Sequence, residues 1–76
     1  MTKFKCVKST SSGKYSPQVG VVLEGELVHV QREYGVEARI NLLKDSDHKD
    51  VDGKPYWSAG ESIPLKGSIW SWEEVK

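Results

Sequence analysis

The sequence has little cysteine: Cys6 is the only one, so no disulfide can form within the chain. Small secreted domains usually depend on disulfides, and this lack therefore indicates a reducing compartment. No segment resembles a signal peptide or an apolar membrane span. We therefore expect a cytoplasmic protein with no membrane partner. Cys6 alternates with Phe4 in a short apolar pattern, which predicts a small core residue rather than a reactive thiol.

The sequence also lacks an excess of positive charge, with eleven basic and eleven acidic residues. Proteins dedicated to nucleic acids usually carry such an excess, because phosphate contacts supply much of their affinity. The basic residues are nevertheless uneven, since the first twenty residues hold no acid. Four lysines lie there and are the candidate nucleic-acid contacts: Lys3, Lys5, Lys8 and Lys14. We predict weak binding to nucleic acids at physiological salt.

Catalytic motifs are absent as well. No Gly-x-Ser-x-Gly pattern is present. Residues 9–14, rich in serine, lack the spacing of a phosphate-binding loop. The histidines, His29 and His48, have no recognisable nucleophile beside them in the sequence. A chain of 76 residues also has little length from which to build a deep cleft. We expect no enzyme, no catalytic residue and no cofactor.

An acidic segment at residues 44–62 is the one place that suggests a metal. Clustered carboxylates suit hard cations, but an EF-hand loop needs ligands at positions 1, 3 and 5 and glycine at position 6. Counted from Asp45, those last two positions are Lys49 and Asp50. We therefore predict a solvated loop and no metal site. The potential ligands in this segment are Asp45, Asp47, His48, Asp50 and Asp52.

No window shows a sustained 3.6-residue apolar period, so no long helix is expected. Short apolar or alternating runs are typical of strands, and glycine-containing turns separate them. These runs occupy residues 3–7, 18–23, 26–31, 37–43 and 68–75. They predict one all-β domain over residues 1–76, either a small SH3-like barrel or a strongly bent antiparallel sheet of about five strands.

The clearest local prediction is a hairpin formed by residues 26–31 and 37–43. Gly35 supplies the positive φ that a tight turn between them needs. Gly25 interrupts the apolar run before the hairpin, which indicates a bend or a bulge. Alternation about the turn predicts five core residues in the hairpin: Val28, Val30, Ala38, Ile40 and Leu42.

Several segments together resemble a known group of proteins. Residues 1–7 form a lysine-alternating strand, Val19 and Gly20 open a second strand, and the chain closes with an aromatic residue before Glu-Glu-Val. In these features the sequence resembles small SH3-like proteins encoded by bacteriophages and prophages, most of them of unknown function. The resemblance implies a phage context, a host cytoplasm and a binding role. The acidic loop at residues 44–62 is longer than in that group, and no functional residue carries over.

Aromatic residues are abundant, with three tryptophans and three tyrosines. Tryptophan and tyrosine are favoured anchors of protein interfaces. Trp57 follows Pro55 and precedes small residues, so we predict that Trp57 and Tyr56 are exposed. Trp70 and Trp72 share one face of a strand and are expected to be mainly structural. The predicted partner-binding residues are Tyr56, Trp57 and Tyr34.

Three functions agree with these patterns. The first is a non-catalytic module that docks on a host or phage protein through an aromatic surface, of which a groove for proline-rich ligands is one form. The second is a single-stranded nucleic-acid-binding protein that uses the basic N-terminal strand and stacks bases on aromatics. The third is a structural or virion-associated subunit that assembles with copies of itself through an exposed strand edge.

Overall fold

The computed structural model describes residues 2–76, and its regular secondary structure consists of β-strands alone. The strands are β1 (Thr2–Ser9), β2 (Val22–Arg32), β3 (Gly35–Leu42), β4 (Ser62–Pro64) and β5 (Trp70–Val75). They form one antiparallel sheet in the order β4-β3-β2-β1-β5. The predicted all-β fold of about five strands is confirmed. Within residues 2–76, no helix has the length and apolar character that would let it cross a membrane.

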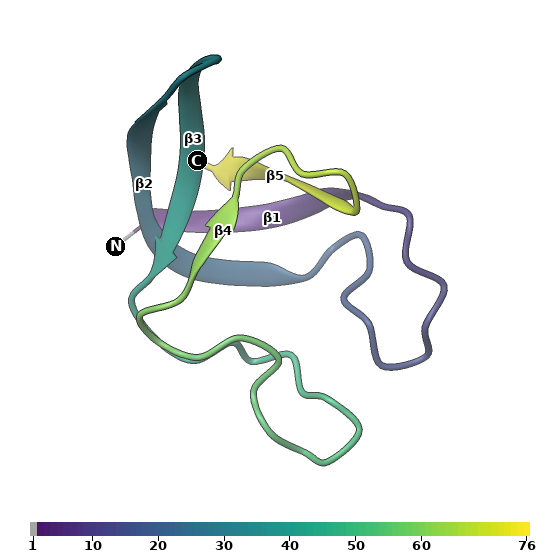
Figure 1. The fold of residues 1–76 in the computed structure, drawn as a ribbon. Coiled ribbons are helices and arrows are strands. Elements are labelled where there is room, and N and C mark those ends of the chain that lie inside the picture. The colour runs from purple at the N-terminus through teal and green to yellow at the C-terminus, as the bar shows by residue number, and fades with distance from the viewer. Residues whose placement is uncertain (1) are drawn as a thin grey trace.

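The sheet bends because strand β2 turns sharply along its length (Figure 1), and the strand registers place the change of partner at Gly25. Residues 22–25 of β2 pair with β1, whereas residues 25–32 pair with β3. A Cβ atom at Gly25 would overlap the main-chain oxygen of Asn41 and lie 2.9 Å from Cγ2 of Ile40. Only glycine lets the two backbones approach this closely, and the bend predicted at this position is therefore confirmed.

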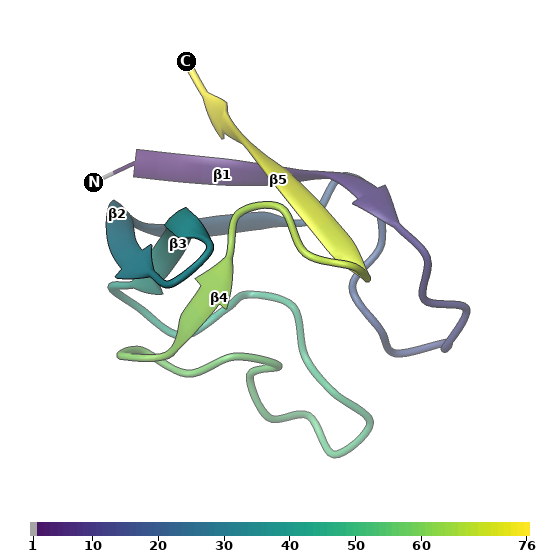
Figure 2. The same ribbon diagram turned by 45° about the horizontal axis from the view of Figure 1, so that its top comes forward.

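The two edge strands approach each other without closing the sheet into a barrel (Figure 2). The chain that leaves β4 meets β5 through an isolated bridge between Lys66 and Ser71. The amide of Trp72 donates to the carbonyl of Leu65 at 2.8 Å. Of the two architectures that the sequence predicts, the strongly bent sheet is the one observed.

The β2–β3 hairpin has a two-residue turn, because Arg32 pairs with Gly35, whose φ is 131°. This register places Leu27 opposite Ile40 and Val28 opposite Arg39. Residues directly opposite each other in neighbouring strands share a face of the sheet. The two-residue turn therefore puts Val28 and Val30 on one face of the sheet and Ile40 on the other.

The hairpin core prediction is thus correct in part. Ile40 and Leu42 are fully buried, and Ala38 lies half-buried on the same face. The prediction for Val28 and Val30 is wrong, because alternation within each strand does not fix the register between the strands.

The core combines residues from all five strands with Trp57 of the loop between β3 and β4. Cys6 is completely buried, as predicted, and burial raises the pKa of its thiol. The raised pKa keeps the thiol protonated, which suits a packing role. The core consists of Phe4, Cys6, Leu23, Ile40, Leu42, Trp57, Ile63 and Trp72.

Candidate functional site

Four aromatic side chains gather at the end of the sheet where the two long loops lie. We call Tyr56, Trp57, Trp70 and Trp72 the aromatic cluster. Ring centroids are 4.8 Å apart for Tyr56–Trp57, 5.2 Å for Trp57–Trp70 and 5.7 Å for Trp57–Trp72, all edge to face. Such pairs add about 0.5–1.5 kcal/mol beyond the burial of area. Trp57 contacts the other three rings and is the centre of the cluster.

Strand β5 supplies two members of the cluster. Trp72 pairs with Cys6 and is 2 % exposed, so its predicted structural role is confirmed. Trp70 pairs with Ser9, beyond an irregularity in β1, and remains half-buried. Its indole N–H donates to the carbonyl of Pro17 at 2.9 Å. Trp70 thus fixes a loop through its nitrogen while part of its ring stays accessible.

Trp57 is held by a serine eleven residues earlier in the chain. Ser46 Oγ accepts a hydrogen bond from the Trp57 amide at 3.0 Å and donates to the carbonyl of His48 at 2.9 Å. The Ser46 amide donates in turn to the carbonyl of Trp57 at 2.8 Å. Ser46 is itself buried. These bonds direct the indole of Trp57 into the core.

The predicted exposure of Trp57 is therefore wrong, since only 8 % of this residue is accessible. The prediction rested on Pro55 and on the small residues that follow Trp57, all of them close to it in the sequence. The residues that cover it, Trp70 and Trp72, come from β5 and are distant in the sequence. The other half of the predicted pair, Tyr56, is half-buried and packs against the ring of His48 at 5.8 Å.

The acidic loop between β3 and β4 is ordered by its own carboxylates. Asp50 Oδ1 accepts hydrogen bonds from the amides of Asp52 at 2.8 Å and Lys54 at 3.0 Å. Asp45 Oδ1 accepts one from the amide of Ala59 at 2.8 Å. These carboxylates satisfy backbone donors in turns. In the described part of the chain, no three His, Cys, Asp or Glu side chains are grouped so that they could hold a metal ion.

The serine-rich loop between β1 and β2 is tied to the same end of the molecule. His48 Nε2 lies 2.8 Å from the carbonyl oxygen of Tyr15. Because a carbonyl can only accept, Nε2 must carry the proton. The carbonyl of Pro17 accepts from Ser9 Oγ at 3.0 Å as well as from Trp70. Both long loops are therefore fixed against the aromatic cluster.

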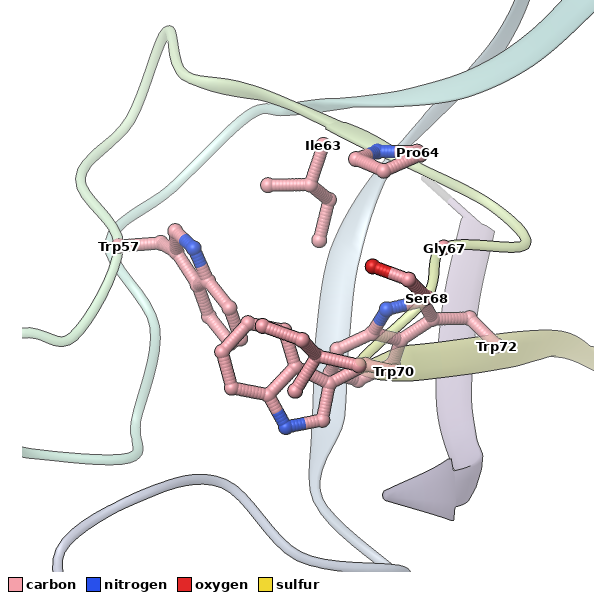
Figure 3. Close-up of a pocket in the computed structure, with 8 residues that line it drawn as sticks. Trp57, Ile63, Pro64, Gly67, Ser68, Trp70 and Trp72 are labelled. Atoms are coloured by element: carbon pink, nitrogen blue, oxygen red, sulfur yellow. The ribbon is translucent and has the colours of Figure 1, made fainter. Parts of the chain in front are cut away.

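A pocket of about 150 Å³ opens beside the aromatic cluster (Figure 3). Ser68 carries the only polar group among its side chains apart from the indole nitrogens, and none of them is titratable. Ile69, one of the lining residues, is 44 % exposed. A dry cavity of roughly 150 Å³ can hold a molecule such as benzene, so the space suits one apolar side chain. The lining residues are Trp57, Ile63, Pro64, Gly67, Ser68, Ile69, Trp70 and Trp72.

The third predicted partner residue, Tyr34, does not line this pocket but a neighbouring hollow, together with Leu65 and Lys66. It occupies the turn of the β2–β3 hairpin, is 79 % exposed, and donates to Glu37 Oε2 at 3.0 Å. The hydrogen bond from Arg39, and then that from Tyr34, lowers the pKa of Glu37. The structure therefore brings Tyr56 and Trp57 together but leaves Tyr34 at a separate place.

The four candidate lysines do not form one basic surface. In the strand registers, Lys3 lies opposite Glu24 and Lys5 lies opposite Glu73. Lys8 lies opposite Ser71, and the Lys14 ammonium is 5.6 Å from the centre of the Tyr15 ring. Acids on the neighbouring strands thus offset the charge of β1, which weakens any attraction to phosphates.

Sequence reasoning missed the residues that complete the pocket. Pro64 and Ile69 flank a turn at Lys66 and Gly67, where the Gly67 amide donates to the carbonyl of Trp70 at 2.8 Å. The proline and the glycine do predict a turn. That this turn stands over Trp57 depends on the bend of the sheet, which brings β5 beside the chain that leaves β4.

No protein-family model, curated protein or solved structure matches this chain. The fold and the site define a small antiparallel β domain that carries an apolar aromatic pocket.

Proposed function

We propose that this protein is a non-catalytic binding module, which docks on a protein partner by receiving one uncharged apolar side chain in the aromatic pocket. The observation that carries the proposal is the pocket itself. Three indoles and the side chains of Ile63, Pro64 and Ile69 surround a space about the size of one side chain. Tryptophan-lined pockets of this kind are frequent at the energetic centres of protein interfaces.

The chemistry of the pocket supports binding rather than catalysis. General acid–base catalysis needs a titratable group within hydrogen-bond reach of the reacting atom. The hydroxyl of Ser68 is the only hydroxyl among the lining side chains, and no histidine or carboxylate lines the pocket beside it. An arrangement of indoles, aliphatic groups and one hydroxyl can bind and orient an apolar group.

The packing of the rings favours a protein partner over single-stranded nucleic acid. Bases stack on the flat face of an accessible aromatic ring. Trp57 and Trp72 are buried, and the rings of the cluster meet edge to face. The offset lysines of β1 supply little compensating charge. The resemblance to phage-encoded proteins supports a host or phage protein as the partner.

The pocket can be tested by placing a charge at one of its lining residues. Peptides selected from a random display library on the folded protein should share an apolar residue. Ile69→Asp should weaken their binding at least about tenfold, because an uncompensated charge disfavours an apolar contact. Val51→Asp is the matched control, since Val51 is 67 % exposed and lies outside the pocket lining. Peptides that bind the Ile69→Asp variant as well as the original protein would contradict the proposal.

A further inference from the structure

One long strand edge of the sheet is left unpaired. On the side away from β3, β2 pairs with β1 only as far as Gly25, and no strand within residues 2–76 pairs with its remainder (Figure 1). The amide of Leu43 donates to the carbonyl of Glu24, so the peptide groups of Glu24 point toward β3. These directions alternate along an antiparallel strand. The peptide groups of Leu27, His29 and Gln31 therefore point toward the open edge.

This edge lacks the features that usually protect an open strand. Short length, proline, charged side chains and bulges all discourage pairing with another chain. Edge strand β4 has three residues and ends in Pro64, and edge strand β5 carries Glu73 and Glu74. Residues 27–31 of β2 are Leu-Val-His-Val-Gln, with regular pairing to β3 throughout. The open part of β2 is thus a suitable template for a further strand.

We propose that the further strand is β2 of a second copy of this chain, paired antiparallel about a two-fold axis at His29. In this register Glu26 lies opposite the second copy's Arg32, and Val28 lies opposite the second copy's Val30. Both pairings occur twice, as the symmetry of a two-fold interface requires. Opposite charges and β-branched residues are favourable pairs when they lie directly across a sheet.

The same register matches the backbone. Leu27 lies opposite the second copy's Gln31, and the two His29 residues lie opposite each other. The outward-pointing peptide groups of one copy therefore face the outward-pointing peptide groups of the other. Each such pair exchanges two hydrogen bonds in an antiparallel ladder. Shifting the axis by one residue keeps this match, but it puts Glu26 opposite Val30 or Val28 opposite Arg32. The charge pattern therefore selects the axis at His29.

The charges at this edge are accessible. Glu26 is exposed, and Arg32 has about two fifths of its side chain accessible while it lies 3.4 Å from Glu37 of its own chain. The pocket beside Trp57 is formed by other segments, so the two surfaces can act at the same time. This inference goes beyond the proposed function and does not depend on it.

Sedimentation of the purified protein from micromolar to millimolar concentration tests the proposal. We expect a monomer–dimer equilibrium whose larger species has twice the 8.5 kDa mass of the chain. Glu26→Arg and Arg32→Glu should each weaken self-association more than about tenfold, because like charges then face each other. An equimolar mixture of these two variants should form heterodimers, since every charged pair is again opposite in sign.

Two more variants complete the test. Glu33→Arg makes the same charge change at the hairpin turn, outside the paired stretch, and should leave the dimer intact. His29→Pro should abolish the dimer but keep the fold, because it removes an N–H that points away from β3. Circular dichroism checks that each variant is folded. A protein that stays monomeric at millimolar concentration, or a dimer indifferent to Glu26→Arg and His29→Pro, would overturn the inference.

Discussion

The two ends of the bent sheet are stabilised in different ways. At the loop end, Trp57 and Trp72 are buried. Ser46 Oγ accepts a hydrogen bond from the Trp57 amide in one long loop, and the Trp70 indole donates one to the carbonyl of Pro17 in the other. At the hairpin end, the backbone ladder between β2 and β3 continues to the turn, while Tyr34 stands almost fully exposed. Side-chain packing thus shapes a pocket at one end, and backbone pairing leaves an edge at the other. One sheet can carry two unrelated surfaces because its ends depend on different interactions.

Removing one large aromatic ring from each end should give the largest difference in the free energy of unfolding. Trp57→Ala should lower the free energy of unfolding by about 3–5 kcal/mol, because the centre of the aromatic cluster is lost. A domain of this size has only a few kcal/mol in reserve, so this variant should be largely unfolded. Tyr34→Ala should change stability by less than about 0.5 kcal/mol. Urea denaturation followed by circular dichroism measures both free energies of unfolding. Similar decreases in the two variants would show that the two ends do not differ in this way.

Ser46 should show a smaller but distinct effect at the loop end. Ser46→Ala leaves the buried amide of Trp57 without its acceptor, which should cost about 1–3 kcal/mol. Ser12→Ala, an exposed serine in the loop between β1 and β2, is the control and should be neutral. Thermal melts of the two variants provide the measurement. If Ser46→Ala has the same melting temperature as the original protein, the serine does not hold Trp57 in place.

The smallest effect is electrostatic and lies at the hairpin end. The pKa of Glu37 is lowered, first by its hydrogen bond from Arg39, so Arg39→Met should raise that pKa toward its ordinary value. A lowered pKa in the folded state contributes stability above the ordinary pKa, and this contribution is lost as the pH falls through the lowered value. Solvent screening keeps the contribution small.

A carbon-13 titration of the Glu37 carboxyl group by nuclear magnetic resonance measures this shift directly. Lys44→Met removes a cation whose partner is Asp47 and should leave the Glu37 titration unchanged. An unchanged titration in Arg39→Met would mean that the ion pair does not persist in solution.

The sequence predicts features that depend on neighbouring residues along the chain. Apolar and alternating runs identify β1, β3 and β5 and the buried Ile40 and Leu42, and the glycines at positions 25 and 35 mark the bend and the turn. The predicted runs 18–23 and 26–31 belong to one strand, β2, which begins only at Val22, and β4 was not predicted. The core positions of Val28 and Val30 were wrongly predicted, because the turn length sets which residues face each other across the hairpin. Local patterns therefore give the elements more reliably than the register.

The aromatic cluster shows where local reasoning ends. Trp57 is covered by rings from β5 and fixed by Ser46, and none of these contacts is visible in the residues around it. Most residues of the acidic loop are exposed, as predicted for a solvated loop, but the hydrogen bonds that Asp50 accepts from backbone amides within it were not predicted. Asp followed two residues later by another turn residue is a signal that could have indicated this.

The proposal that the loop end binds one apolar side chain can be tested by a titration followed by two-dimensional nitrogen-15 resonance spectra. N-acetyl-leucine amide serves as a probe for one uncharged apolar side chain. We expect saturable shifts of the indole N–H signals of Trp57, Trp70 and Trp72 and of the amides of residues 67–69. Residues 27–36 should be unchanged, and Ile69→Asp should abolish the response. Shifts concentrated at residues 27–36, or no saturable shift of any indole signal, would contradict it.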